Sequence, residues 1–106
     1  MVGLDDYLLP KEEVKFQSKN NVQYGGKNYQ VIVTDRRIIL YARRGAIFKS
    51  DDVVTFKLSD VEGIKYKEEG LIGKRGIIEI QGKTKAKLMG STSEMKTLYQ
   101  QLLQFL

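Results

Sequence analysis

The sequence predicts a mainly β fold, a curved antiparallel sandwich or open barrel of about seven short strands capped by one C-terminal α-helix. Between residues 14 and 88, apolar side chains recur at every second position, which is the period of a half-buried strand. After Gly90 the apolar spacing changes to three and four, which is the period of an amphipathic helix. The length of 106 residues fits one domain, spanning residues 1–106.

The predicted elements follow one another with little intervening chain. Residues 4–9 fit one helical turn, which Pro10 ends because proline cannot continue a helix. Strands then occupy about residues 12–89 and are separated by breaks rich in Gly, Asn and Asp. The predicted strands cover 14–18, 29–33, 36–41, 54–58, 63–69, 78–81 and 86–88, with loops or turns at 20–28, 34–35, 43–45, 70–76 and 82–83.

The C-terminal segment, residues 92–106, is predicted to form the helix. Residues 91–94, Ser-Thr-Ser-Glu, fit a capping box at its N-terminus. A single apolar stripe must dock on the rest of the protein, and we expect it to close the end or side of the barrel. A coiled-coil or partner-binding helix is the alternative, but two heptads are short for a coiled coil. The stripe consists of Met95, Leu98, Tyr99, Leu102, Leu103 and Leu106.

The composition excludes several kinds of chemistry. The chain has no Cys and no His, which excludes disulfides, thiolate metal sites, Cys nucleophiles and histidine bases. We therefore expect no enzyme activity, no cofactor and no metal. No apolar run is long enough to span a membrane and the first residues lack a signal-peptide pattern, so we expect a cytoplasmic protein. The net charge of +5 is uneven, because residues 14–49 and 70–106 are basic and the other segments are acidic.

Three segments resemble the small prokaryotic pleckstrin-homology-like (PH-like) domains. Residues 8–14, LLPKEEV, resemble the Leu-Leu-Pro-x-Glu sequence that precedes their first strand. Residues 29–40, YQVIVTDRRIIL, are similar to their strand, Thr-Asp/Asn turn and second strand opening with Arg. Residues 56–64, FKLSDVEGI, resemble their link between the fourth and fifth strands. The resemblance spans nearly the whole chain and implies the PH-like superfold, which carries lipid-binding, peptide-binding and self-assembly functions alike.

The resemblance also implies a location for a binding surface. In this superfold the loops that join strands 1–2, 3–4 and 6–7 gather at one open end, where eukaryotic members hold inositol phosphates. All three corresponding loops carry cations in this chain. Strand 2 of the lipid-binding members carries alternating cations, whereas residues 29–33 here carry none, so the resemblance implies attraction to anionic lipid without stereospecific headgroup recognition. The candidate residues for an anionic headgroup or a partner are Lys19, Lys27, Arg43, Arg44, Ile47, Phe48, Lys49, Lys83 and Lys85.

Two interpretations of Ile47 and Phe48 stay open at this point. As an apolar loop tip between cations, they could insert at headgroup depth in an anionic membrane. As the start of the fourth strand, they would lie in the core.

Other constellations are weaker signals. Residues 73–76, Gly-Lys-Arg-Gly, resemble the phosphate-clamping loop of RNA-binding KH domains, but strand-like flanks favour a hairpin with a basic turn. The acidic neighbours Asp51-Asp52 and Glu68-Glu69 do not fit a pair of carboxylates acting together, because neighbours on a strand point to opposite faces. We interpret them as solvated loop residues.

The sequence therefore predicts a non-catalytic PH-like interaction module. Small free-standing members of the family that it resembles are expected to self-associate, so a protein partner or a homo-oligomer is the main expectation. Peripheral binding to anionic membrane lipid through the basic open-end loops is the alternative, and would bring the protein to the inner membrane face. RNA binding through the 73–76 turn has the least support.

Overall fold

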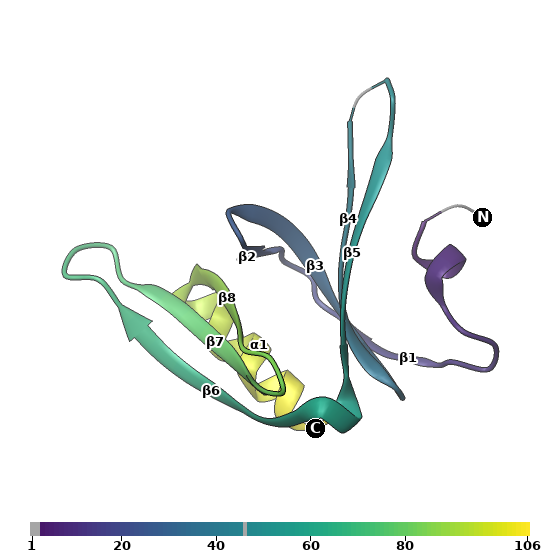
Figure 1. The fold of residues 1–106 in the computed structure, drawn as a ribbon. Helices are drawn as coiled ribbons and strands as arrows, with labels where there is room; N and C mark the ends of the chain where they lie inside the picture. The colour runs from purple at the N-terminus through teal and green to yellow at the C-terminus, as the bar shows by residue number, and fades with distance from the viewer. Residues whose placement is uncertain (1–2, 46) are drawn as a thin grey trace.

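The computed structural model describes residues 3–45 and 47–106, and shows an antiparallel sheet of eight strands with one C-terminal helix (Figure 1). The predicted mainly β fold with one C-terminal helix is confirmed. The elements are η1 (Leu4–Tyr7), β1 (Val14–Gln17), β2 (Val22–Tyr24), β3 (Lys27–Thr34), β4 (Arg37–Arg44), β5 (Ser50–Lys57), η2 (Leu58–Asp60), β6 (Val61–Glu69), β7 (Arg75–Gly82), β8 (Ala86–Ser91) and α1 (Thr92–Leu103).

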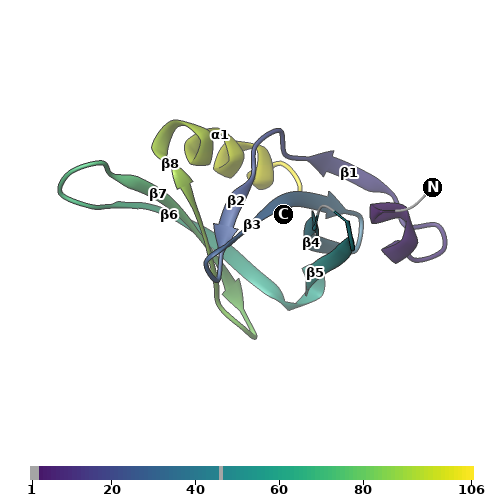
Figure 2. The same ribbon diagram turned by 90° about the horizontal axis from the view of Figure 1, so that it is seen from above.

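The strands form one open sheet in the order β5-β4-β3-β2-β8-β7-β6. Strand β3 is shared, because its first residues pair with β2 and its later residues pair with β1. A single pairing, Gln23 with Met89, joins β2 to β8 and links the two halves of the sheet. Figure 2 shows the two halves set at an angle to one another. The sheet is not closed: β5 and β6 lie at the two ends of this order, and β1 pairs with β3 alone.

The segment predicted as a loop over residues 20–28 is partly a strand, which corrects the prediction. The side chain of Ser18 interrupts the first strand: its hydroxyl accepts the Val31 N–H at 2.9 Å and donates to the Asn20 carbonyl at 2.9 Å. The chain leaves the ladder there and resumes pairing as β2. Only Gly25 and Gly26 form the β2–β3 turn, with φ of 58° and 79° that glycine adopts without strain. A first strand broken in two raises the count from about seven to eight.

Helix α1 ends earlier than predicted, at Leu103 instead of Leu106. Beyond it, the Phe105 ring stacks on Phe16 with ring centroids 5.9 Å apart, which takes the chain out of the helix. The predicted capping box is also wrong. Ser91 makes no side-chain cap hydrogen bond, since it still belongs to β8 and pairs with Arg75.

Helix α1 lies over β6, β7 and β8, so the predicted docking of its apolar stripe is confirmed (Figure 2). Met95, Leu98 and Leu102 are buried against the sheet. The stripe is not buried along its whole length, because Leu103 and Leu106 remain about half exposed.

The core lies on the face of the sheet that α1 covers. Alternate residues of β3, β4, β7 and β8 enter it, which is the period-2 pattern expected from the sequence. Its members include Val31, Val33, Ile38, Leu40, Ile78, Ile80 and Leu88.

Within the described part of the chain, no helix is long and apolar enough to cross a membrane.

Candidate interaction surface

The tip of the β4–β5 hairpin presents two large apolar side chains to solvent. Ile47 is 85% exposed and Phe48 is 90% exposed. Of the two interpretations left open by the sequence, the one in which they begin the fourth predicted strand and enter the core is therefore wrong, because that strand, β5, begins at Ser50. The turn requires glycine at position 45, because its φ of 97° and the close approach of the Phe48 carbonyl leave no room for a Cβ atom. Ala46, between Gly45 and Ile47, lies outside the described residues.

The cations at the base of this hairpin are paired with two aspartates. Arg43 Nε lies 3.5 Å from an oxygen of Asp51, and Arg44 Nε lies 3.5 Å from an oxygen of Asp52. Lys27 Nζ lies 3.8 Å from the same Asp52 carboxylate. Asp51 and Asp52 were predicted as loop residues, but they belong to β5 and pair across the ladder with Arg43 and Ala42. These two carboxylates thus compensate two of the three positive charges, since Asp52 is shared by Arg44 and Lys27.

Asp51 also braces the hairpin against the N-terminal turn. The hydroxyls of Tyr7 and Tyr41 donate to its two carboxylate oxygens at 2.8 Å and 3.2 Å. The hydrogen bond to Asp51 raises the pKa of Tyr7, and burial followed by the Asp51 bond raises the pKa of Tyr41. Both hydroxyls therefore remain protonated donors at neutral pH, and the Tyr7–Asp51 bond ties the base of the hairpin to η1.

Lys49 differs from the other cations of the hairpin. It directly follows Phe48, is exposed, and has no ion pair among residues 3–45 and 47–106. The hairpin tip therefore joins two apolar side chains to one uncompensated positive charge.

The β7–β8 turn, which carries Lys83 and Lys85, lies apart from this tip. Figure 1 shows the β7–β8 turn in the lower part of the view and the β4–β5 tip at the top. Lys83 Nζ lies 3.4 Å from an Asp60 carboxylate oxygen of η2. Lys85 is exposed. The structure therefore does not bring these two lysines beside Lys49.

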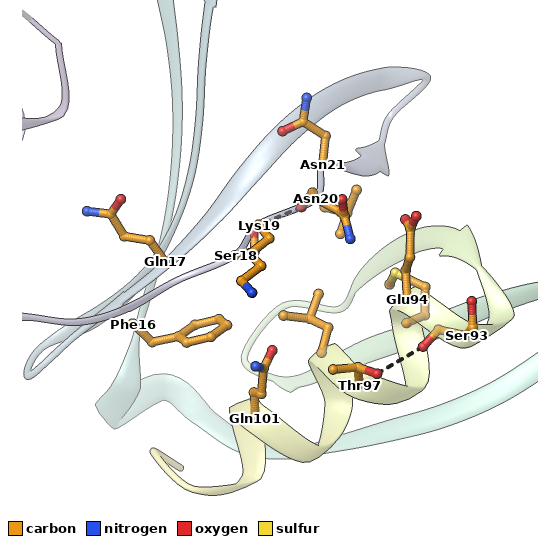
Figure 3. A pocket seen from close by; sticks show the side chains of 13 residues that line it. Phe16, Gln17, Ser18, Lys19, Asn20, Asn21, Ser93, Glu94, Thr97 and Gln101 are labelled. Carbon is orange, nitrogen blue, oxygen red and sulfur yellow. Dashed lines mark hydrogen bonds between the residues drawn. The ribbon is translucent and has the colours of Figure 1, made fainter.

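Lys19 lines a separate groove of about 450 Å³ between the β1–β2 connection and α1 (Figure 3). The floor is apolar and includes Met95 and Leu98, while the rim is polar. Lys19 comes from one wall and Glu94 from the other. Four amide side chains complete the polar rim, those of Gln17, Asn20, Asn21 and Gln101.

A second apolar tip was missed by the sequence analysis. At the β6–β7 turn, Leu71 and Ile72 are exposed at 102% and 96%. The predicted hairpin with a basic turn is confirmed here, and it excludes the KH-like arrangement, in which the loop joins two helices. The available signal was two large apolar residues between Gly70 and Gly73, where turn positions are normally polar.

A third feature is an apolar groove of about 410 Å³ beside the free edge of β6. The end of α1 and the chain after it form one wall, and η2 with the start of β6 forms the other. The apolar lining residues are Leu58, Val61, Ile64, Leu103, Phe105 and Leu106.

Comparison with known proteins supports the family assignment. The family model described as "Bacterial PH domain" matches residues 8–103. No curated protein and no solved structure gives a match. The matched range includes every strand and the whole of α1. The chain therefore belongs to the bacterial PH domain family, whose PH-like fold generally serves as a binding module.

Proposed function

We propose that this protein is a non-catalytic module that attaches to anionic membrane surfaces through the tip of its β4–β5 hairpin. One observation carries the proposal: Ile47 and Phe48 are 85% and 90% exposed, directly before the uncompensated Lys49. Full burial of such a side chain is worth about 1.5–3 kcal/mol relative to water. A bilayer interface takes up apolar side chains on a narrow tip without requiring a complementary protein surface.

Electrostatics adds a smaller contribution. A lysine near an anionic membrane surface contributes about 1 kcal/mol. Lys49 contributes in full, whereas Arg43 and Arg44 contribute less because Asp51 and Asp52 already neutralise them. The attachment is therefore weak to moderate and depends on salt.

The proposed recognition is of surface charge and not of one headgroup. Strand β3 offers no cation over Tyr29–Val33, so a stereospecific inositol-phosphate site of the eukaryotic type lacks its ligands. No catalytic step is proposed, since the chain has neither Cys nor His and the tip holds no nucleophile with a base.

The test is co-sedimentation with vesicles of phosphatidylcholine and phosphatidylserine. We expect the double variant Ile47→Ser/Phe48→Ser to bind at least about tenfold more weakly than the wild type. Leu9→Ser is the matched control, because Leu9 is also an exposed apolar residue, 49% exposed, but lies outside the tip. Equal binding of wild type and double variant rejects the proposal. Binding of the triple variant Arg43→Ala/Arg44→Ala/Lys49→Ala that is as strong as that of the wild type rejects the electrostatic part.

A second candidate function is self-association or binding of a protein partner, which the sequence analysis favoured. Its supporting observation is the apolar groove beside the free edge of β6, where Leu103 and Leu106 are 50% and 45% exposed. Exposed sheet edges are a common route to pairing between chains. Light scattering after size exclusion tests it: a dimer that Leu103→Asp/Leu106→Asp converts to a monomer supports it, and a strict monomer of the wild type at high concentration rejects it.

A further inference from the structure

We infer that the β6–β7 tip is a second membrane-insertion point, so that the protein attaches to an anionic bilayer through two separate hairpins. This inference rests on the proposed function of the β4–β5 tip. Leu71 and Ile72 are exposed at 102% and 96%, so neither side chain is shielded by the rest of the protein. Gly70 and Gly73, with φ of 116° and 65°, shape the turn that holds both side chains outward.

The charge around this tip is positive. Glu68 and Glu69 precede it. Lys96 Nζ lies 3.2 Å from Glu68, and Lys67 Nζ lies 3.1 Å from Glu69 and 3.4 Å from Glu79, so this lysine is shared between two carboxylates. Lys74 follows the tip and has no ion pair within the described ranges 3–45 and 47–106. Arg75 donates to the neutral amide of Gln23 and makes no ion pair among the described residues, although it lies opposite Glu69 in the β6–β7 ladder. The β6–β7 tip therefore repeats the combination found at the first tip, an exposed apolar pair beside free cations.

The arrangement of the two hairpins allows both tips to meet one flat surface. In Figure 1 the β4–β5 tip lies at the top and the β6–β7 tip at the left, and no other part of the ribbon crosses the line that joins them. Helix α1 and the C-terminus lie below that line in this view. In this view the backbone therefore leaves both tips free to face the same surface.

The shape of this contact favours a bilayer over a protein partner. A stable protein interface buries about 800 Å² on each partner over a continuous surface. Two separated turns, each with two apolar side chains, do not supply such a surface. They suit a fluid interface that takes up each tip independently, and two linked weak contacts bind much more tightly than either alone.

The chain offers a clean probe because it contains no Trp. Phe48→Trp and Ile72→Trp each place a single emitter at one tip, and Gln100→Trp on the exposed side of α1 is the control. Each variant is mixed with phosphatidylcholine vesicles with or without phosphatidylserine, and then with vesicles that contain brominated lipid, which quenches inserted Trp. We expect a blue shift and quenching at positions 48 and 72 with anionic vesicles, and neither at position 100.

The outcomes separate the two proposals. Insertion at 48 without insertion at 72 overturns this inference and leaves the proposed function standing. Insertion at 72 alone supports a membrane contact at this tip but overturns the β4–β5 attachment, and no insertion at either position overturns both. A blue shift at 72 that depends on protein concentration without vesicles means that the tip packs against a second copy, which also overturns the inference.

Because Trp itself favours the membrane interface, a double variant without Trp is needed as a second test. We expect Leu71→Ser/Ile72→Ser to bind anionic vesicles roughly tenfold or more weakly than the wild type. The same change at both tips should abolish sedimentation with vesicles. Unchanged binding of Leu71→Ser/Ile72→Ser contradicts the inference, provided that circular dichroism and unfolding of the variant match the wild type.

Discussion

Glu12 joins the two sequence segments that are most typical of the family. Its buried carboxylate accepts hydrogen bonds from Arg37, at 2.7 Å and 2.8 Å, and from the Thr34 hydroxyl at 2.6 Å. The Leu9 N–H donates to it as well. These bonds, that of Arg37 above all, lower the pKa of Glu12 from 4.5 to about 2. The Leu-Leu-Pro-Lys-Glu and Thr-Asp-Arg-Arg segments are thus parts of one structural network and not of the two hairpin tips.

The Glu12 network makes the stability of the fold depend on pH in the acidic range. Because folding lowers the pKa of Glu12, its contribution is complete above about pH 4.5 and is lost as the pH falls through about 2. The shift corresponds to roughly 3 kcal/mol. We expect Glu12→Gln to lower the free energy of unfolding at neutral pH and to reduce its change across this window. Denaturant titrations at several pH values measure both effects.

The matched control is Glu13→Gln, since Glu13 is exposed and its partner Lys15 is exposed too. We expect this change to lower the free energy of unfolding by less than about 0.5 kcal/mol, as for most surface ion pairs. Similar losses for the two variants would contradict the role given to Glu12.

Gly76 is required by close packing and not by a turn. The sequence analysis assigned it to the 70–76 turn, but it lies in β7, opposite Gly90 of β8, and Met95 of α1 packs onto the pair. A Cβ at Gly76 would lie 2.7 Å from the Met95 Cβ and 3.0 Å from the Tyr66 hydroxyl.

We therefore expect Gly76→Ala to lower the free energy of unfolding by about 1–3 kcal/mol, the usual effect of overpacking a core. Gly63→Ala is the control, because a Cβ at Gly63 meets no atom within 4 Å. Thermal unfolding of the two variants gives the comparison. A loss at Gly63 equal to that at Gly76 would mean that strand propensity, and not contact with Met95, is responsible.

At the residue scale, the sequence located the candidate cations but could not show which are free. From the sequence, Arg43 and Lys49 are both cations of the same loop. Only the pairing of β4 with β5 shows that Asp51 neutralises Arg43. Likewise, the apolar pair Ile47-Phe48 fits a buried strand as well as an exposed tip. The position of the turn decides between them, and that position depends on backbone geometry at Gly45.

At the scale of elements, helix α1 was predictable in kind but not in extent. The apolar spacing correctly identified Met95, Leu98 and Leu102 as its buried face. The end of the helix depends on the stacking of Phe105 on Phe16, a contact between residues far apart in the chain. The break of the first strand at Ser18 has the same origin, since it depends on a hydrogen bond to Val31.

Two neighbouring leucines of α1 test how the helix docks. Leu102 is fully buried and Leu103 is 50% exposed. We expect Leu102→Ala to lower the free energy of unfolding by about 2–5 kcal/mol, because it leaves a cavity between helix and sheet. Leu103→Ala should have a much smaller effect, and denaturant unfolding of both variants measures the difference. Equal losses would contradict the described face of the helix.

At the scale of the whole molecule, the fold separates a rigid body from two projecting tips. The body is held by the core under α1, the Glu12–Arg37 pair and the aspartates of β5. The tips carry exposed apolar residues, Ile47 and Phe48 on one and Leu71 and Ile72 on the other. The family pattern predicted the body from sequence, whereas the tips became visible only when the hairpins were placed in space (Figure 1).

The most direct measurement of this account is the partition of the wild-type protein between buffer and vesicles with and without phosphatidylserine, at low and high salt. We expect binding to both kinds of vesicle, and stronger binding to the anionic vesicles than to the neutral ones. Binding should weaken as salt screens the free cations, and the fraction due to the apolar tips should remain. No binding to either vesicle, or equal and salt-independent binding to both, would contradict the account.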